Sequence, residues 1–484
     1  RRLTASQAIV EGLSRDGGLY LPESIPQLTL ADIRALARLS YPERAAKIMK
    51  LYLEEFSEEE LLGFAQKAYG PAKFDTPAAA PVVQLADNTY IQELWHGPTC
   101  AFKDMALQML PYLLTASLKK TGEEKTVCIL VATSGDTGKA ALEGFHDVKG
   151  TRIIVFYPEG GVSAVQQAQM ATQTGDNVKV CAIRGNFDDA QTGVKQVFAA
   201  CQGKDLHGAM LSSANSINIG RLAPQVVYYF RSYADLVKSG RIRVGDKVNY
   251  VVPTGNFGDI LAGYFAKCMG LPVGRLVCAS NANDVLTEFI STGRYDRRRP
   301  FYKTTSPSMD ILVSSNLERL LFLLSRDPAY VAELMRQLRE DGVYQLSDRL
   351  LAQLKQDFSC GCCDDKGAAD VIGRLWREQH YLCDPHTAVA WSVAEQLSEE
   401  LHDTGAPTVV LSTASPYKFP AAVLSALGRE TGENEFFMMN ELCRISGVPI
   451  PRNLAGLEGR PVLHKDVIDK DAMLDYVLAE VLKK

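Results

Sequence analysis

Short hydrophobic runs alternate with longer amphipathic segments along most of this chain. From about residue 86 onward the runs lie at 126–132, 152–158, 178–183, 247–254 and 407–414. Each run is followed by a segment whose apolar residues recur with helical spacing, and Gly, Ser or Asn residues lie between the two. Apolar strands that alternate with helices are typical of parallel sheets buried on both faces. The pattern therefore predicts an α/β architecture with mainly parallel sheets.

The N-terminal part of the chain has a different pattern, in which helical segments follow one another without strands. Ser40 and Glu43 have the spacing of a capping box, and Ser57 and Glu60 repeat it. Residues 75–83, rich in Pro and Ala, are typical of a linker. The chain is also longer than one hydrophobic core usually serves. We expect three parts with a chain that crosses between the last two: a helical region (1–85), a smaller α/β domain (86–240) and a larger α/β domain (241–484).

Composition and charge exclude some classes of function but do not identify one. The 484 residues carry a net charge of −5, which gives no attraction to nucleic acids or anionic membranes. No apolar run approaches the ~18 residues of a membrane helix, and the chain opens without the apolar core of a signal peptide. Eleven cysteines, mostly inside apolar runs, favour free thiols in a reducing compartment, so we expect a cytoplasmic protein. The spacing of Cys360, Cys362 and Cys363 fits none of the usual zinc patterns, and we expect no metal.

One loop suggests a phosphate cradle at the end of a predicted strand, where open α/β sheets bind their ligands. It spans residues 253–259, and Gly255 and Gly258 let its backbone approach an oxyanion. The loop is neither a Walker P-loop nor a G-x-G-x-x-G turn, which disfavours a nucleotide. A phosphate cradle and a plain strand-to-helix turn both fit this sequence.

Two further loops carry polar side chains at similar places. In residues 132–140 the hydroxyls of Thr133, Ser134 and Thr137 suit a carboxylate or a phosphate, although helix capping explains them equally well. In residues 212–221 a string of small polar residues ends at Arg221, whose guanidinium suits bidentate phosphate recognition. A surface ion pair is the simpler interpretation of a single arginine.

Lys103 lies behind a Gly-Pro turn, at the start of a helical pattern that Pro111 is expected to kink or interrupt. By spacing alone, it is a solvated lysine on an amphipathic helix. A lysine at a strand-to-helix junction, in a sheet that also has phosphate loops, suggests instead a Schiff base to pyridoxal phosphate. Only a primary amine forms such an exchangeable imine.

Taken together, these motifs resemble threonine synthase, a family of the fold-type II (tryptophan synthase beta-like) pyridoxal phosphate enzymes. The similar segments occur in one order along nearly the whole chain, at 4–23, 96–106, 132–141, 213–221, 253–259, 306–322, 384–390 and 412–419. The resemblance implies two parallel-sheet α/β domains and a pyridoxal 5'-phosphate cofactor. It also implies the conversion of O-phospho-L-homoserine and water to L-threonine and phosphate, with neither metal nor nucleotide.

The resemblance further implies roles for individual residues. Lys103 would form the Schiff base and later move protons, and Thr413 would face the pyridine nitrogen. The implied cofactor contacts are Lys103, Gly255, Asn256, Phe257, Gly258, Asp259, Thr413 and Asp136. The implied substrate contacts are Thr133, Ser134 and Thr137 near the carboxylate, and Asn215, Ser216 and Arg221 at the substrate's own phosphate.

The sequence departs from the family pattern at two places. Related loops often read Ala-His-Pro-Ala-Lys-Phe where this chain has residues 414–419, so any role of that histidine is not carried over to Ser415, and the roles of Ser415 and Tyr417 stay open. Many fold-type II relatives have Asn where Asp136 stands, as partner of the ring hydroxyl.

Other functions on the same scaffold stay open. A phospho-lyase that releases 2-oxobutyrate would share every cofactor contact. A serine/threonine dehydratase has no use for a second phosphate site, and a catalytically silent binding module has no use for Lys103. We expect a small-molecule enzyme that is a monomer or a homodimer.

Overall fold

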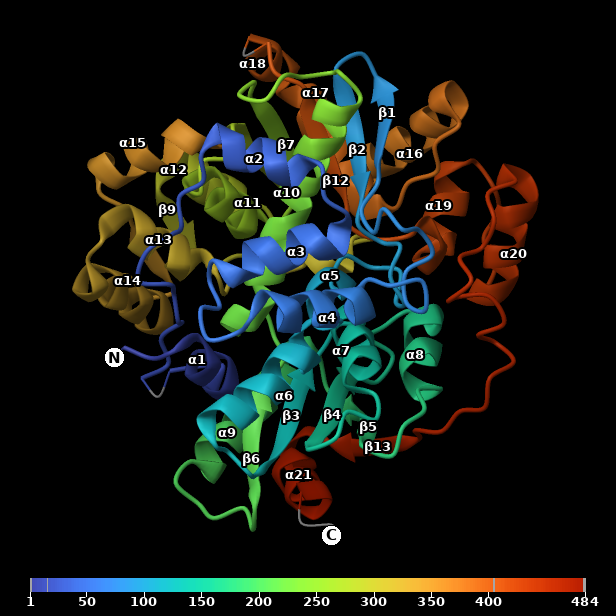
Figure 1. The fold of residues 1–484 in the computed structure, drawn as a ribbon. Helices are drawn as coiled ribbons and strands as arrows, with labels where there is room; N and C mark the ends of the chain where they lie inside the picture. Colours follow the sequence, from blue (N-terminus) through green and yellow to red (C-terminus); the bar gives the residue numbers. More distant parts are fainter. Residues whose placement is uncertain (1, 15, 404, 482–484) are drawn as a thin grey trace.

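The structure is a computed structural model that describes residues 2–14, 16–403 and 405–481, with two main sheets and helices on both faces of each (Figure 1). The larger sheet has the strand order β1 (Val82–Ala86), β2 (Thr89–Glu93), β12 (Thr408–Ser412), β7 (Val248–Pro253), β8 (Val273–Ser280) and β11 (Phe358–Cys362). The β1–β2 pair is antiparallel and the other neighbours are parallel. This sheet occupies the upper part of Figure 1.

The second sheet has five strands, all parallel, and lies in the lower part of Figure 1. Its order is β13 (Asp466–Asp469), β5 (Val178–Arg184), β4 (Thr151–Pro158), β3 (Thr126–Ala132) and β6 (Ala209–Ser213). A separate antiparallel pair joins β9 (Arg294–Asp296) to β10 (Val343–Gln345). The predicted α/β architecture with mainly parallel sheets is confirmed.

The helices fall into two groups by their place in the chain. Those up to β7 are α1 (Ala5–Glu11), α2 (Leu30–Ala37), α3 (Tyr41–Lys50), α4 (Glu58–Ala68), α5 (Asp104–Leu107), α6 (Leu110–Thr121), α7 (Asp136–Phe145), α8 (Ala164–Ala171), α9 (Phe187–Cys201), the 3-10 helix η1 (Ile219–Arg221) and α10 (Ala223–Lys238). Those after it are α11 (Gly258–Cys268), α12 (Val285–Thr292), η2 (Pro307–Met309), α13 (Leu317–Ser325), α14 (Pro328–Glu340), α15 (Asp348–Asp357), α16 (Asp365–Gln379), α17 (Pro385–Gln396), α18 (Ser398–Asp403), η3 (Pro416–Lys418), α19 (Pro420–Ala426), α20 (Glu435–Ser446), η4 (Lys470–Ala472) and α21 (Met473–Val481).

Successive residues of the central strands point into different hydrophobic cores. In β4, Ile153 and Val155 belong to the large core that includes the N-terminal helices, whereas Ile154 and Phe156 belong to a second core with α9 and α21. A strand that alternates between two cores has no polar face. This is why β3 and β4 are nearly continuous apolar runs in the sequence.

The local sequence signals for helix ends are confirmed. The Ser40 hydroxyl caps α3 and the Ser57 hydroxyl caps α4, and both capping boxes are complete. Pro111 also interrupts its helical segment as predicted, because α5 ends at Leu107 and α6 begins at Leu110. Its ring occupies the first turn of α6, where no intrahelical N–H bond is lost.

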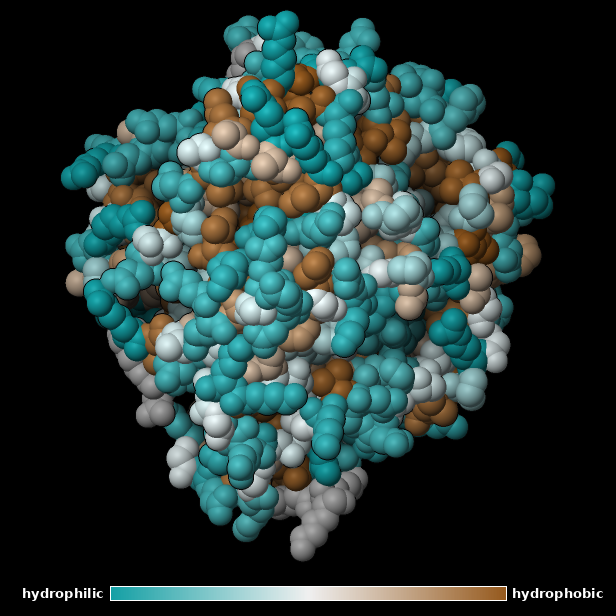
Figure 2. All heavy atoms as spheres, in the orientation of Figure 1, coloured by the Kyte–Doolittle hydropathy of each residue, from teal (hydrophilic) through white to brown (hydrophobic). Residues whose placement is uncertain are grey.

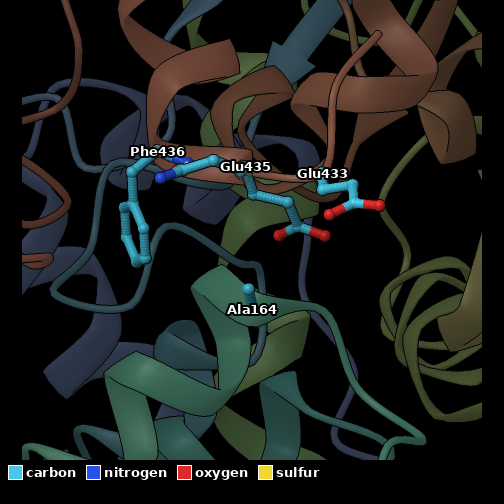
Figure 3. A pocket seen from close by; sticks show the side chains of 5 residues that line it. Ala164, Glu433, Glu435 and Phe436 are labelled. Carbon is cyan, nitrogen blue, oxygen red and sulfur yellow. The ribbon is translucent and has the colours of Figure 1, made fainter.

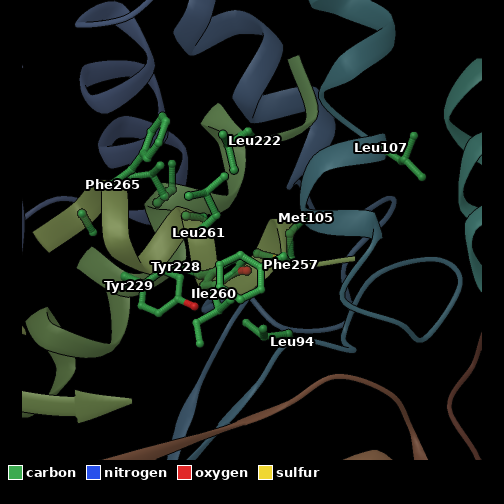
Figure 4. Packing of buried hydrophobic residues seen from close by; sticks show 14 of the residues in the cluster. Leu94, Met105, Leu107, Leu222, Tyr228, Tyr229, Phe257, Ile260, Leu261 and Phe265 are labelled. Carbon is green, nitrogen blue, oxygen red and sulfur yellow. The ribbon is translucent and has the colours of Figure 1, made fainter. Parts of the chain in front are cut away.

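Helices α10 and α11 pack together beside the six-stranded sheet through buried aromatic residues (Figure 4). The rings of Tyr228 and Tyr229 lie 4.9 Å apart, and Tyr229 makes an edge contact with Tyr250 at the same distance. The Tyr229 hydroxyl donates to the carbonyl of Asp259 at 2.7 Å. The core therefore holds the first turn of α11, which follows the predicted phosphate loop.

The C-terminal part of the chain returns to the five-stranded sheet. After α20 it runs along one side of the molecule to β13, which forms the edge of this sheet beside β5, and α21 then packs on α9 (Figure 1). No sequence pattern predicted β13. The predicted domain boundaries at residues 85 and 240 stay a prediction. The chain crosses between the sheets near both of its ends, since β2 lies in the six-stranded sheet and β13 lies in the five-stranded one.

A shallow pocket of about 350 Å³ lies between helices α8 and α20 (Figure 3). Glu435 at the start of α20 accepts a hydrogen bond from the N–H of Val165 at 3.1 Å. The pocket is lined by Ala164 and residues 433–436. It contains neither Lys103 nor any predicted phosphate loop, and we assign it to the joint between these helices.

The surface shown in Figure 2 is mostly hydrophilic, with hydrophobic side chains broken into separate areas over the upper part of the molecule. Among the described residues, no helix has the length and apolar character needed to cross a membrane.

Replacing Met473 by Ala should lower the free energy of unfolding by about 2–5 kcal/mol, because the side chain is buried where α21 meets α9 and its removal leaves a cavity. Urea-induced unfolding measures the change. Phe437→Ala, at a side chain that is 66% exposed, is the control and should change stability by less than about 0.5 kcal/mol. Equal losses in both variants would contradict the packing of α21.

Candidate active site

The loop that carries Lys103 is shaped by the carboxylate of the next residue. Asp104 accepts hydrogen bonds from the Thr99 N–H at 2.8 Å and from the Thr99 hydroxyl at 2.9 Å. A Cβ atom on Gly97 would lie 2.6 Å from the Asp104 side chain, so only glycine fits there. The turn therefore folds back on the start of α5 and places Lys103 at its N-terminus.

The amine of Lys103 lies in a polar but partly buried setting. Its Nζ donates to the hydroxyl of Ser308 at 3.2 Å. Burial lowers the pKa of Lys103 and the nearby Asp136 carboxylate raises it again in part, which leaves a pKa of about 8. A fraction of the amine is therefore unprotonated near neutral pH, as a nucleophile requires. The solvated lysine expected from spacing alone is wrong.

Asp136 forms a buried ion pair with Lys418, a residue that the sequence analysis did not assign. Their Oδ1 and Nζ atoms lie 2.5 Å apart, and the side chains are 2% and 0% exposed. Gln166 also donates to Asp136 at 2.9 Å, and Lys418 donates to the carbonyl of Thr99 at 3.0 Å. Burial raises the pKa of Asp136, but Lys418 and then Lys103 lower it by more, to well below its usual range. Lys418 lies in the segment 412–419 that resembles the family, but nothing in the local sequence indicated its partner.

The loop before α11 presents unpaired N–H groups. Phe257 has a left-handed backbone (φ 65°). The carbonyl of Gly255 accepts from the Ser314 hydroxyl at 2.8 Å, and that of Asn256 accepts from the Asn316 N–H and side-chain amide at 3.0 Å. The N–H groups of residues 255–258 have no acceptor in the described part of the chain. Successive free N–H groups at a helix N-terminus fit a phosphate.

The two glycines of this loop have different surroundings. A Cβ on Gly255 would lie 2.5 Å from the carbonyl oxygen of Ser308, whereas the nearest atom to a Cβ on Gly258 is 3.5 Å away. The Asp259 carboxylate accepts from the N–H of Ile260 at 2.9 Å, and burial raises its pKa to about 7. Its expected contact with the cofactor stays a prediction.

The end of β12 lies against the Lys103 loop. The carbonyl of Thr413 accepts from the N–H of Phe102 at 2.8 Å, and the carbonyl of Cys100 accepts from the N–H of Ser415 at 3.0 Å. The Ser415 hydroxyl accepts from the N–H of Tyr417. The Tyr417 hydroxyl in turn donates to the carbonyl of Val448 in the segment after α20. Both side chains, whose roles the sequence left open, thus shape the backbone here.

The three hydroxyls at the start of α7 have different surroundings: one caps the helix, and two are partly exposed. The Thr133 oxygen accepts from the N–H groups of Gly135 and Gly138, both at 2.9 Å, which is the capping alternative. Its hydroxyl hydrogen is still available to a ligand. Ser134 and Thr137 are partly exposed beside it. Their contact with a substrate carboxylate stays a prediction.

Arg221 is buried, and only 3% of it is exposed, so the surface ion pair considered for it is wrong. Its Nη1 donates to the carbonyl of Ala214 at 3.0 Å, but its Nε has no partner among the described residues, and neither has Oδ1 of Asn215. Burial lowers the pKa of Arg221 to about 10. The hydroxyl of Ser216 lies 3.5 Å from that of Ser315. A buried guanidinium whose Nε lacks a partner is suited to an anion.

A second buried arginine, Arg319, was not assigned from the sequence, although it lies in a segment that resembles the family. Its guanidinium donates to the carbonyls of Tyr20, Ser216 and Ile217 and to the side chain of Asn316. Arg319 therefore holds the loop before Arg221 against α13 and the N-terminal region, and its donors are used within the protein.

The geometry fits pyridoxal phosphate, with one partly buried amine and a cluster of free N–H groups. Three family models match the chain: the threonine synthase N terminus (residues 1–69), the pyridoxal-phosphate dependent enzymes (74–414) and the C-terminal part of threonine synthase (387–477). Fold and site together define a pyridoxal-phosphate-dependent enzyme of fold type II.

Known relatives narrow the class. The threonine synthase of Pseudomonas aeruginosa is 42% identical over 426 residues, which cover 88% of each chain. The crystal structure of pyridoxal phosphate-bound threonine synthase from Brucella melitensis has a TM-score of 0.88 at 40% identity, and the match covers 99% of this chain and 97% of that one. The chain belongs to the threonine synthase family. It spans 60% of the length of human threonine synthase-like 1, to which it is 39% identical over 452 residues.

His96, at the start of the Lys103 loop, should make stability depend on pH. Its Nδ1 lies 2.6 Å from Asp75 and its Nε2 lies 2.8 Å from Glu93. Burial lowers the pKa of His96, but these two hydrogen bonds raise it by more, from 6.5 to about 9. The imidazolium is thus favoured in the folded state, and its contribution to stability is complete below pH 6.5 and lost as the pH rises through about 9.

The free energy of unfolding should therefore fall between pH 6.5 and 9 by at most roughly 3 kcal/mol, and the melting temperature should fall with it. His96→Gln should be less stable at pH 6 and should lose most of this pH dependence. Retention of the wild-type slope in His96→Gln would show that other groups cause it.

Gly255→Ala should lose the cofactor, since the added Cβ meets a backbone carbonyl at 2.5 Å and displaces the loop or the Ser308 turn. Gly258→Ala is the matched control, because its Cβ meets only ordinary contacts. Cofactor absorbance after gel filtration measures retention. Equal retention in both variants would contradict the close approach at Gly255.

Proposed function

We propose that this chain converts O-phospho-L-homoserine and water to L-threonine and inorganic phosphate. The observation that carries the proposal is a second candidate anion site, where Nε of the buried Arg221 has no partner among the described residues. The free N–H groups of residues 255–258 suffice for the cofactor phosphate, so a second phosphate accounts for Arg221. A substrate with its own phosphate supplies it.

The residues of the chain then take the following roles. Pyridoxal phosphate, when bound, supplies the electron sink that makes the α-hydrogen of the amino acid acidic. Lys103 holds the cofactor and moves protons at the α- and β-carbons, for which its pKa of about 8 is suited. Arg221, with Asn215 and Ser216, binds the substrate phosphate and fixes the γ-carbon–oxygen bond that breaks.

Two further proposed contacts concern the cofactor ring and the substrate carboxylate. Thr413 offers a neutral hydroxyl at the ring nitrogen, which does not favour a protonated nitrogen as a carboxylate would. Such a weaker electron sink suits elimination and replacement chemistry. Ser134 and Thr137, with the hydroxyl hydrogen of Thr133, bind the substrate carboxylate at the N-terminus of α7.

We also infer a cytoplasmic location and a monomer or homodimer. The location is supported by the eleven cysteines, all of which lie in the described part of the chain and form no disulfide. The oligomeric state is best measured by light scattering of the purified protein.

A phospho-lyase that releases 2-oxobutyrate is the alternative, since it would use the same residues up to the loss of phosphate. The deciding experiment incubates the purified holoenzyme with O-phosphohomoserine and identifies the products by mass spectrometry. L-threonine and phosphate in equal amounts support the proposal. 2-Oxobutyrate as the main product would favour the lyase.

Arg221→Ala should lower kcat/KM for O-phosphohomoserine about 10- to 200-fold, the loss of a charge-assisted bond of about 1.5–3 kcal/mol. Cofactor content should stay at the wild-type level, because residues 255–258 lie on another loop. Any side reaction with L-serine, which carries no phosphate, should be nearly unchanged. Equal losses on both substrates would mean that Arg221 is structural.

A further inference from the structure

A hydroxyl that none of the roles above uses lies between Lys103 and Asp136. It belongs to Ser308, which is partly buried in η2. Its Oγ is 3.2 Å from Nζ of Lys103 and 3.5 Å from Oδ2 of Asp136. Asp136 is in turn paired with Lys418, so four side chains form one continuous polar chain.

The charges set the direction of the hydrogen bonds in this chain. Asp136 is a carboxylate, because it is paired with Lys418, and a carboxylate only accepts. The single hydroxyl hydrogen of Ser308 therefore goes to Asp136. The oxygen lone pairs of Ser308 are then left to accept an N–H of Lys103. One N–H of the amine is thus fixed. Because the nitrogen is tetrahedral, this limits the directions of its other N–H bonds and its lone pair.

The backbone of Ser308 contacts two other segments of the chain, at His386 and at Gly255. Its N–H donates to Nε2 of His386 at 3.2 Å, and Nδ1 of His386 lies 2.6 Å from Asp384, which is 0% exposed. On the other side, the carbonyl of Ser308 packs against Gly255 of the phosphate loop so closely that no Cβ fits between them. The hydroxyl is therefore placed by the fold and has little freedom to turn away from Lys103.

We propose that Ser308 is a positioning residue for Lys103, which holds the amine by the hydrogen-bonded chain Lys103–Ser308–Asp136 and leaves the nitrogen lone pair directed into the site. This matters whenever Lys103 is a free amine that must bond to the cofactor again. The proposal rests on the proposed function only in taking Lys103 as the cofactor lysine, and it does not depend on which substrate is used.

The test compares Ser308→Ala with Ser306→Ala in the full-length protein. Ser306 is a matched control, since it is a buried serine two residues away whose hydroxyl accepts from Asn281 at 3.0 Å. The cofactor is removed and pyridoxal phosphate is added back, and the rate at which its absorbance changes on bonding to Lys103 is followed. Melting temperatures of the apo forms show whether each variant is folded.

Ser308→Ala should bond to pyridoxal phosphate about 2- to 10-fold more slowly than wild type, the effect of one lost hydrogen bond. In the loaded enzyme, kcat should fall by a similar factor with KM nearly unchanged. Ser308→Thr keeps a hydroxyl and should restore both rates. Wild-type rates in Ser308→Ala, or an equal loss in Ser306→Ala, would overturn the proposal. Because the add-back rate involves no substrate, a failure to form L-threonine would count against the proposed function and not against the role of Ser308.

Discussion

The ion pair between Asp136 and Lys418 is the interaction on which the site depends most. Asp136 begins a helix that covers the five-stranded sheet, and Lys418 follows a strand of the six-stranded sheet, so the pair joins the two sheets beside Lys103. Burying two charges costs several kcal/mol each, which their attraction offsets only when further hydrogen bonds are made. Gln166 and the carbonyl of Thr99 supply these bonds. The pair adds little net stability, but it fixes the position of the surrounding loops, and loss of one partner would leave the other charge buried alone.

Two buried arginines, Arg221 and Arg319, differ in their hydrogen-bond partners although burial affects their pKa values alike. Burial lowers the pKa of Arg221 and of Arg319 to about 10. Arg319 donates to three carbonyls and one side-chain amide, so its charge is solvated by the protein itself. Arg221 donates to one carbonyl and leaves Nε without a partner among the described residues. Arg319 donates to the carbonyls of Ser216 and Ile217, so it holds the loop that precedes Arg221.

Sequence patterns predicted what is decided locally and missed what depends on distant partners. The caps at Ser40 and Ser57 and the break at Pro111 follow from residues within one helical turn. The strand β13 is short and largely exposed, and only its pairing with β5, far away in the sequence, makes it a strand. The proposed role of Lys103 rests mainly on resemblance, because its spacing favoured a solvated side chain. Ser308 and Lys418 also lie in segments that resemble the family, but their contacts were not predicted, since these join segments more than one hundred residues apart.

The described chain passes between the two sheets three times, after β2, after β6 and after α20. The third passage is anchored at both ends, by the Tyr417 hydroxyl on the carbonyl of Val448 and by His464 on the carbonyl of Gln173 at 2.9 Å. Any motion that opens the site between the sheets must therefore bend all three passages together. Lys103 lies in the first passage and Arg221 lies in the second, whereas Lys418 lies between β12 and the helices α19 and α20 that precede the third. Movement of one sheet against the other would therefore change the distances among these three cations.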